Sequence, residues 1–244
     1  MMYLETADID TATAEYASRF KGAAGEFLLK RQTEITLSLL RDLPKATVLD
    51  VGGGHAQLAE PLVENGFEVT VTGSDDRCIE RLAQRIPRFD FEYKTCDSLQ
   101  LPFEDRSFDV VMSFRLLSHV RRWPELIAEL SRVAKYCVLF DYADKRSFNF
   151  LYNCLFEAKR KMEGNTRHFN LYSRGEISRE LAKNGFQKPA FKPQFLCPMV
   201  VHRQLKSRSI SSVMEGCFRV TGMTQFFGSP IIVRSDRGKT VGPR

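Results

Sequence analysis

The 244-residue sequence contains no run of about 18 or more apolar residues, so no segment is predicted to span a membrane. Residues 1–20 include several acids and no long apolar stretch, which argues against a signal peptide. The six cysteines form no CxxC pair, so the zinc-ribbon pattern is excluded and no metal site is expected. Scattered thiols of this kind indicate a reducing compartment and predict a cytoplasmic location.

Basic residues are scarce in one part of the chain only. Residues 1–140 hold 17 Lys and Arg against 22 Asp and Glu, whereas residues 141–244 hold 19 against 8. The net charge of +6 therefore belongs to the C-terminal part. An anionic partner is expected to meet that part, although a solvated basic surface explains the same charges equally well.

Short apolar runs alternate with segments of helical spacing through the middle of the chain. The runs cover residues 46–51, 67–73, 91–96, 108–114 and 136–142, and the helical segments cover 56–66, 75–86 and 123–134. This alternation predicts βαβ units and a parallel sheet. Residues 1–45 read as a helical cover. Beyond residue 142 the sequence predicts helices over 147–164, 173–186 and 209–220, an extended segment over 190–201 and a last strand over 229–236.

The stretch VLDVGGGHAQLAEPL, residues 48–62, places a glycine cluster between the first predicted strand and helix. A dinucleotide-binding turn needs Gly-x-Gly-x-x-Gly, and here Gly52 and Gly54 fill two places while Gln57 stands at the third. This disfavours a nicotinamide oxidoreductase. The turn suits a ligand that needs close backbone contact but carries no phosphate, and a purely structural turn is the remaining alternative.

Asp75 follows the second predicted strand, about 20 residues after the glycines, where a carboxylate can accept both hydroxyl hydrogens of a ribose. Such a residue is an equally good N-cap for the helix that follows. Asp75 and its neighbour Asp76 could divide these two tasks.

Residues 96–120, CDSLQLPFEDRSFDVVMSFRLLSHV, together with the glycine stretch, resemble the class I S-adenosylmethionine-dependent methyltransferases, and most closely the small-molecule branch that includes enzymes of quinone biosynthesis. The resemblance covers residues 46–142 well. It implies a Rossmann-like, doubly wound, mostly parallel seven-stranded sheet with helical lid insertions. Residues 1–45 would be the cover, and residues 46–244 the methyltransferase domain with inserts near 143–172 and 200–228.

The resemblance also implies S-adenosylmethionine as the cofactor and assigns residues to it by position. Asp50 would orient the loop and meet the methionine amine, Asp75 would hold the ribose, and Asp97 would accept from the adenine amino group. The full implied set is Asp50, Gly52, Gly54, Asp75, Asp97, Ser98, Leu99, Ser113 and Phe114. Asp76 departs from the family pattern, because an apolar residue usually follows the ribose acid and packs on adenine.

The acceptor implied by the resemblance is a small molecule with an apolar body and, given the basic C-terminal part, an anionic group. His119 and Arg115, just after the fourth predicted strand, are the candidate catalytic residues. For each of them a packing or solvated role is the alternative. The candidate acceptor-binding residues are Tyr16, Arg19, Phe148, Tyr152 and His168.

Other functions stay open at the level of sequence. A pI of about 9.0 fits an RNA methyltransferase of the same fold, but SFRLL stands where base methyltransferases carry an Asn-Pro-Pro-Tyr-like motif. This disfavours methylation of a base amino group and makes a nucleic-acid partner the less favoured reading, while methylation of a wobble-uridine side chain stays open. A non-catalytic cofactor-binding member is the third alternative. The segment 200–228 could cap the acceptor site, form a dimer contact or rest on an anionic membrane, and the oligomeric state is not predicted.

Overall fold

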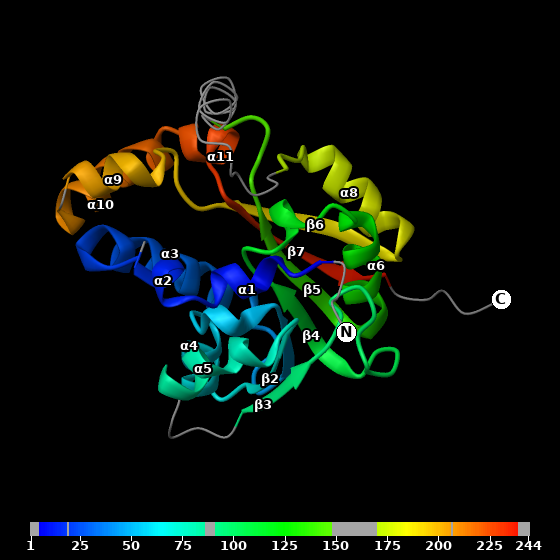
Figure 1. Cartoon of the computed structure of the whole chain (residues 1–244). Coiled ribbons are helices and arrows are strands. Elements are labelled where there is room, and N and C mark those ends of the chain that lie inside the picture. Colours follow the sequence, from blue (N-terminus) through cyan, green and yellow to red (C-terminus); the bar gives the residue numbers. More distant parts are fainter. Residues whose placement is uncertain (1–4, 19, 86–90, 148–169, 206, 239–244) are drawn as a thin grey trace.

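The computed structural model describes residues 5–18, 20–85, 91–147, 170–205 and 207–238, which form one seven-stranded sheet with helices on both faces (Figure 1). The strand order is β3-β2-β1-β4-β5-β7-β6, and β7 runs antiparallel between β5 and β6 while β1 to β5 are parallel. The predicted Rossmann-like, mostly parallel seven-stranded fold is confirmed. The strands are β1 Thr47–Val51, β2 Glu68–Gly73, β3 Glu92–Thr95, β4 Phe108–Ser113, β5 Ala134–Tyr142, β6 Phe186–Pro193 and β7 Ile231–Arg237.

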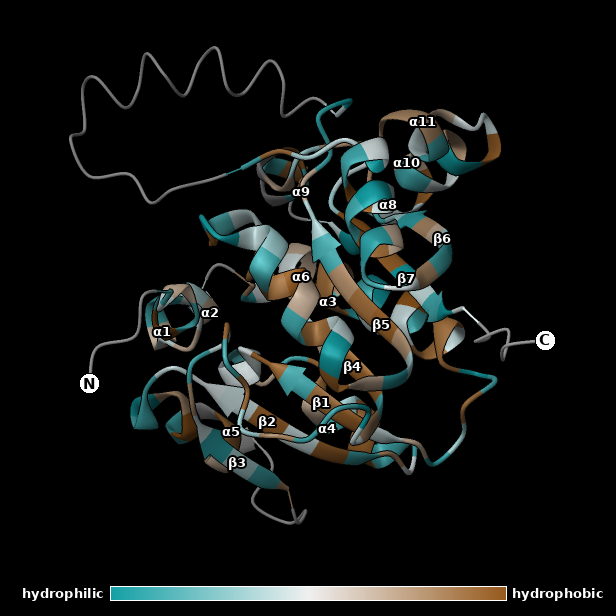
Figure 2. Cartoon of the chain, turned by 90° about the vertical axis from the view of Figure 1, so that its right-hand side faces the viewer, coloured by the Kyte–Doolittle hydropathy of each residue, from teal (hydrophilic) through white to brown (hydrophobic). Residues whose placement is uncertain are grey.

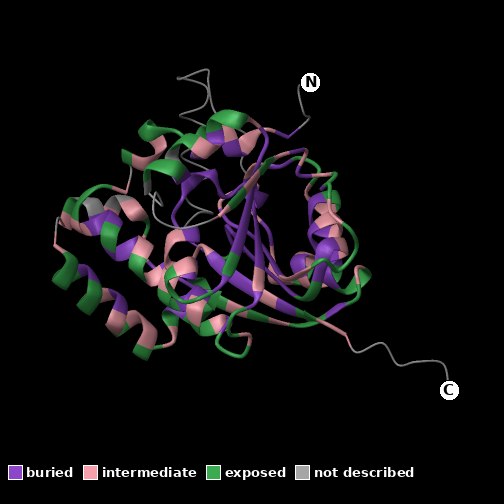
Figure 3. Cartoon of the chain, turned by 90° about the horizontal axis from the view of Figure 1, so that it is seen from below, coloured by how far each residue is buried: buried purple, intermediate pink, exposed green. Residues whose placement is uncertain are grey.

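Helices lie along both faces of the sheet and bury a separate apolar cluster on each. On one face α6 and α8 contribute Leu126, Ile127 and Leu181, and on the other α3, α4 and α5 contribute Ile35, Leu62 and Leu82. The central strands β1, β2, β4 and β5 are mostly buried, whereas the edge strands β3 and β6 are largely exposed or half-buried (Figure 3). The helices are α1 Ala7–Thr11, α2 Ala14–Ser18, α3 Gly22–Leu39, α4 Ala59–Glu64, α5 Ile79–Arg85, α6 Trp123–Val133, α8 Arg174–Lys183, α9 Met199–Leu205, α10 Arg208–Val220 and α11 Met223–Phe227. In the described part of the chain, 3₁₀ turns follow β1, β2 and β4: η1 Gly53–His55, η2 Asp76–Cys78 and η3 Leu117–His119.

Local sequence explains where the helices on one face begin. In α6, Pro124 occupies the first turn, where its missing N–H breaks no helical hydrogen bond. In α8, Ser173 accepts from the N–H of Glu176, and the Glu176 carboxylate accepts from the N–H of Ser173. This reciprocal cap fixes the start of α8.

Two expectations about secondary structure have different outcomes. The helical segment predicted over 56–66 is shorter in the structure, where α4 contains Pro61 and has only 6 residues. The extended segment predicted over 190–201 is wrong at its end, because β6 ends at Pro193 and α9 begins at Met199. Pro198 lies just before that helix and accepts from the N–H of Val201 in its first turn, a position that proline tolerates. The helix predicted over 147–164 lies almost wholly outside the described residues.

None of the helices in the described part of the chain is both long enough and apolar enough to cross a lipid bilayer.

Candidate functional site

The glycine turn after β1 forms a narrow cradle at the carboxyl edge of the parallel strands. Gly52 has a φ of +75° and Ala56 a φ of +56°, so the chain reverses through two left-handed positions around η1. A Cβ on Gly54 would lie 2.8 Å from Cβ of Cys78, the last residue of η2. Glycine is therefore required where the turn after β1 meets the turn after β2.

Asp50 lies beneath this cradle with its carboxylate completely buried. No described residue hydrogen-bonds to either of its oxygens, and burial raises its pKa to about 7. A Cβ on Gly53 would come within 2.3 Å of Oδ2, so the turn closes directly over the carboxylate. A buried, unpartnered carboxylate under a glycine turn fits a ligand with an ammonium group, as the methionine part of S-adenosylmethionine has.

Helix α1 is fastened over the same edge by Asp8, which the sequence analysis did not single out. The Asp8 carboxylate accepts hydrogen bonds from the backbone N–H of Ser74 at 2.6 Å and from its hydroxyl at 2.5 Å. Its Cβ would lie 3.4 Å from a Cβ on Gly52. The N-terminal cover thus contributes a buried acid to the wall of the cradle. The sequence signal, an acid in a short N-terminal helix, is too common to reveal this.

Asp75 is the N-cap of η2, and its carboxylate is bound by the side chain of Arg77. Its carboxylate accepts from the backbone N–H of Arg77 at 2.9 Å, and from Nε and Nη2 of that side chain at 2.7 and 2.9 Å. These hydrogen bonds lower the pKa of Asp75 to about 2, so the carboxylate stays an acceptor. Asp76 accepts from the hydroxyl of Thr95 on β3, which gives this acid a partner where an apolar residue was expected.

The exposed pair of Asp75 and Arg77 gives a testable contrast. Asp75→Ala is expected to weaken S-adenosylhomocysteine binding by about 10- to 100-fold, because a ribose diol would lose a charged acceptor. Arg77→Ala should leave the affinity unchanged or raise it, because exposed ion pairs are weak and its removal frees the carboxylate. Titration calorimetry of both variants distinguishes the roles. Equal losses in the two variants would show that the pair serves only to cap η2.

The remaining residues assigned to the cofactor either form a turn after β3 or are buried at the end of β4. Asp97 accepts from the N–H of Leu99 at 2.9 Å and forms a tight turn, and Ser98 in that turn is buried. Ser113 is buried and donates to the carbonyl of Val51 at 2.9 Å, so its hydroxyl joins β4 to β1. Phe114, just after β4, is also buried. Its side chain lies in the apolar cluster against α3 and α4, because the residue alternation along β4 turns it into that face.

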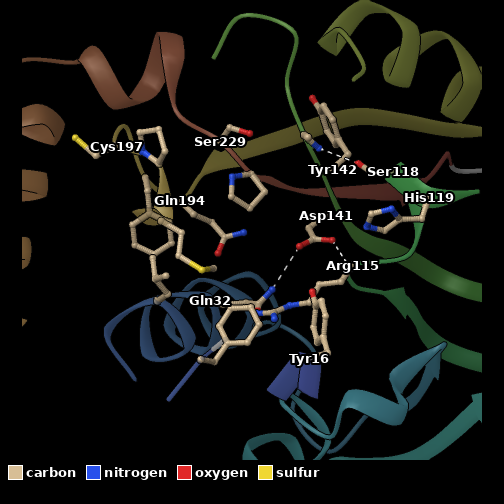
Figure 4. A pocket seen from close by; sticks show the side chains of 17 residues that line it. Tyr16, Gln32, Arg115, Ser118, His119, Asp141, Tyr142, Gln194, Cys197 and Ser229 are labelled. Atoms are coloured by element: carbon tan, nitrogen blue, oxygen red, sulfur yellow. Dashed lines mark hydrogen bonds between the residues drawn. The ribbon is translucent and has the colours of Figure 1, made fainter. Parts of the chain in front are cut away.

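A cavity of about 440 Å³ opens beside the cradle, at the carboxyl ends of β4 and β5 (Figure 4). Aromatic and aliphatic side chains make up much of its wall, with polar groups concentrated on the side toward β4 and β5. The lining residues are Tyr16, Phe20, Leu28, Gln32, Arg115, Ser118, His119, Asp141, Tyr142, Ala143, Gln194, Phe195, Cys197, Pro198, Met199, Ser229 and Pro230. A mainly apolar cavity with a few converging polar groups is typical of a small-molecule site.

Asp141, at the end of β5, is the centre of the polar side. Its carboxylate accepts from the N–H of Arg115 at 2.6 Å and from Nε2 of Gln32 at 3.5 Å, and Nη2 of Arg115 donates to Oε1 of Gln32 at 3.0 Å. The Arg115 guanidinium lies 3.9 Å from the centre of the Phe20 ring. Burial raises the pKa of Asp141 to about 6, and the hydrogen bond from Arg115 opposes this only in part. Figure 4 shows Asp141 between Gln32 and Arg115.

The structure brings several predicted acceptor-site residues to this cavity. Tyr16, Arg115 and His119 all line it. The predicted residues Arg19, Phe148, Tyr152 and His168 lie outside the described residues. Asp141 and Gln32 also line the cavity but were not predicted as site residues. The acid within the apolar run 136–142 could have indicated Asp141.

A buried acid fixes one wall of the cavity. Glu215 on α10 accepts from the N–H groups of Leu196 and Cys197, both at 2.9 Å, and its Oε1 lies 3.2 Å from Nε2 of His202 on α9. Burial alone would raise the pKa of Glu215, but the contact with His202 and the two N–H groups outweigh it and lower the pKa. Both side chains are fully buried.

Removing this acid should destabilise the protein strongly. Glu215→Ala leaves two backbone N–H groups and His202 without their acceptor, and breaking a buried pair in this way costs about 3–5 kcal/mol. Urea unfolding measures the loss. Glu34→Ala is the control, since this half-exposed glutamate forms only long ion pairs with Lys30 and Arg31 and should change the free energy of unfolding little. Similar losses in both variants would contradict the structural role of Glu215.

Comparison with known proteins finds matches to methyltransferases. A family model described as a methyltransferase domain matches residues 24–188. A ubiquinone biosynthesis O-methyltransferase of Paramagnetospirillum magneticum is 35% identical over 85 residues, covering 34% of this chain and 34% of that protein. A phthiotriol/phenolphthiotriol dimycocerosates methyltransferase of Mycobacterium tuberculosis is 33% identical over 114 residues, covering 44% of this chain and 41% of that protein. The matches thus span well under half the length of these curated relatives.

Solved structures share the fold at low sequence identity. A SAM-dependent methyltransferase of Thermotoga maritima aligns with a TM-score of 0.64 at 14% identity, covering 96% of this chain and all of that one (100%). Magnesium protoporphyrin IX methyltransferase of Synechocystis PCC 6803, solved with SAH, aligns with a TM-score of 0.59 at 17% identity, covering 88% and 87%. These likenesses show a common architecture.

Proposed function

Because the chain belongs to the methyltransferase-domain family whose model it matches, we propose that it transfers a methyl group from S-adenosylmethionine to a small molecule bound in the cavity beside the glycine cradle. The predicted class, an S-adenosylmethionine-dependent class I methyltransferase, is confirmed by this membership. One observation carries the choice of acceptor site: a mainly apolar cavity with a buried acid, Asp141, at the same sheet edge as the cradle.

The cradle residues would hold the cofactor. Asp50 would face the ammonium group, Gly52 and Gly54 would allow close backbone contact, and Asp75 and Asp97 would accept from the ribose and the adenine. When bound, the cofactor supplies an electrophilic methyl group. The presence of the buried, unpartnered Asp50 carboxylate beneath the turn supports this placement.

The acceptor we propose has an apolar body and presents an O–H or N–H group to Asp141. Aromatic walls such as Phe20 and Phe195 would exclude water and hold the body, which is the main way to favour a direct displacement. Asp141 would accept the acceptor's proton, and the contact between Arg115 and Gln32 would position that carboxylate. His119 lines the same cavity and is a second candidate for contact with the acceptor.

The relatives' names support an acceptor of this kind. One is named for ubiquinone biosynthesis and one for phthiotriol dimycocerosates, and both names denote small molecules rather than macromolecules. An RNA substrate is the alternative that the basic C-terminal part leaves open, and a non-catalytic member is the other. The division at residues 45 and 46, the insert near 143–172 and the cytoplasmic location stay predictions.

The proposal is tested in two steps. Titration calorimetry of the purified chain with S-adenosylmethionine and S-adenosylhomocysteine should register binding of both. Transfer of a labelled methyl group is then measured with a panel of apolar phenols, alcohols and amines, and with total RNA. Absence of heat from well-folded protein would overturn the cofactor assignment, and transfer to RNA alone would overturn the acceptor assignment.

A further inference from the structure

Helix α1 lies directly on the glycine cradle and contacts both η1 and η2. Cβ of Asp8 lies 3.4 Å from the position that a Cβ on Gly52 would take, and Cβ of Ala12, the C-cap of α1, lies 3.2 Å from that of Gly54. Figures 1 and 2 show α1 at this edge of the sheet, on the side where α5 lies. We call residues 5–12, which include this helix, the α1 strap. Both glycines that were expected to admit a ligand are thus in contact with the strap.

With the strap in place, the cradle is closed to solvent. Gly52, Gly53 and Gly54 are all buried. The Asp50 carboxylate beneath them is completely buried, and no described residue hydrogen-bonds to it. The cavity beside the cradle is lined by none of these four residues. A cationic ligand would relieve the cost of burying this unpartnered carboxylate, but it can reach the cradle only after part of the cover has moved.

Two buried acids hold the strap against the sheet edge. Asp8 accepts from the backbone N–H of Ser74 at 2.6 Å and from its hydroxyl at 2.5 Å. Glu5 accepts from the N–H groups of Arg121 and Arg122 at 3.0 and 3.1 Å. Each carboxylate therefore binds two donors from loops at the carboxyl edge of the sheet, and hydrogen bonds of this kind are stronger than those between neutral groups.

The helix that follows the strap is fastened separately. The hydroxyl of Thr13 accepts from the N–H of Tyr16 at 3.1 Å in the first turns of α2. Tyr16 lines the acceptor cavity, and its ring centre lies 5.9 Å from the Arg115 guanidinium. The strap can therefore leave the cradle by a change of backbone conformation near Thr13, while α2 keeps its own contacts at the cavity.

We propose that the α1 strap closes the cradle in the cofactor-free protein and is displaced when S-adenosylmethionine binds. The inference rests on the proposed function, in which the cofactor needs the backbone of Gly52 and Gly54. The strap and the cofactor then compete for one surface. The apparent affinity for the cofactor is the intrinsic affinity multiplied by the fraction of molecules in which the strap is open. Weakening the strap therefore tightens cofactor binding.

Titration calorimetry of full-length variants with S-adenosylhomocysteine tests this. Asp8→Ala and Glu5→Ala each remove two hydrogen bonds to a carboxylate, and each should lower the apparent Kd by about tenfold. Glu5→Ala identifies the cause, because its partners Arg121 and Arg122 are not among the residues assigned to the cofactor. Asp10→Ala, which changes the exposed aspartate of the same helix, is the matched control and should keep the wild-type Kd.

Hydrogen exchange measured by mass spectrometry gives a second readout that does not depend on activity. In wild type, the backbone amides of residues 5–12 should exchange faster with saturating S-adenosylhomocysteine than without it, because the displaced strap loses its contacts with the sheet edge.

The opposite results would overturn the proposal. Slower exchange of residues 5–12 with the ligand, or weaker binding by Asp8→Ala and Glu5→Ala, would make the strap a part of the cofactor site. An unchanged Kd in both variants would show that the strap does not compete with the ligand. Absence of heat from wild type and from both variants would instead overturn the cofactor assignment of the proposed function, so the two failures are distinguishable.

Discussion

Replacing Asp50 by asparagine is expected to raise the free energy of unfolding of the cofactor-free protein by about 4 kcal/mol at pH 8, and to change it little at pH 4. Burial raises the pKa of this carboxyl to about 7, against 3.8 for an exposed aspartate. Between pH 3.8 and about pH 7, the Asp50 carboxyl is therefore mostly protonated in the native state and mostly ionised in the unfolded state. Stability therefore falls as the pH rises from about 4 to about 7, and the neutral amide removes this fall.

Urea unfolding of both proteins across that pH range measures the effect. Asp105→Asn is the control, because its side chain is 76% exposed and its ion pair with Arg132 contributes little. Parallel pH profiles for wild type and Asp50→Asn would contradict a buried, unpartnered carboxylate. The same variant should weaken S-adenosylmethionine binding at least about tenfold, because the ligand's ammonium group would lose its counter-charge.

Replacing Asp141 by asparagine is expected to lower the rate of methyl transfer by about 10²- to 10⁴-fold while cofactor affinity is retained. The amide can still accept from the N–H of Arg115, so the local structure should persist. With a pKa of about 6, Asp141 becomes an effective proton acceptor only when ionised. The wild-type rate should therefore rise with pH through about 6, and the variant should lack this rise.

Single-turnover rates across pH 5 to 8, together with calorimetry, measure these outcomes. Asp144→Asn is the matched control. Asp144 is also a buried acid near the end of β5, but it pairs with Arg174 at 3.4 Å and does not line the cavity. Its variant should lose stability and keep its rate once folded. A rate loss in Asp144→Asn equal to that in Asp141→Asn would indicate a structural cause for both.

The parts of the molecule that depend on local sequence were predictable. The runs 46–51 and 108–114 are rich in β-branched and apolar residues, which favours buried strands, and the glycine turn carries its own conformational requirement. The burial of Phe114 in the apolar cluster with residues of α3 and α4 could not be read from the sequence, because it depends on which face of the sheet those helices cover. The helix α9 was missed because proline and two valines in the segment 198–201 also suit an extended chain.

The polar side of the cavity could not be predicted because it is made by long-range contacts. Gln32 and Asp141 are 109 positions apart and meet only when α3 lies across the carboxyl edge of β5. Glu215 reaches Leu196 and Cys197 from a helix whose amphipathic pattern gives no sign that an acid on its buried side is satisfied by backbone N–H groups. Asp8 over the cradle is a third case, since it joins the start of the chain to Ser74.

The position of β7 determines when the acceptor site can form during synthesis. The strands around the glycine cradle, β1 to β4, are synthesised before β5, β6 and β7, so that half-site can assemble first. Of the seven strands in the described residues, β7 is synthesised after the others, yet it lies between β5 and β6, and Ser229 and Pro230 just before it line the cavity. A nascent chain stopped before residue 229 would carry a cradle without its partner cavity, and would leave β5 and β6 with open edges that invite aggregation.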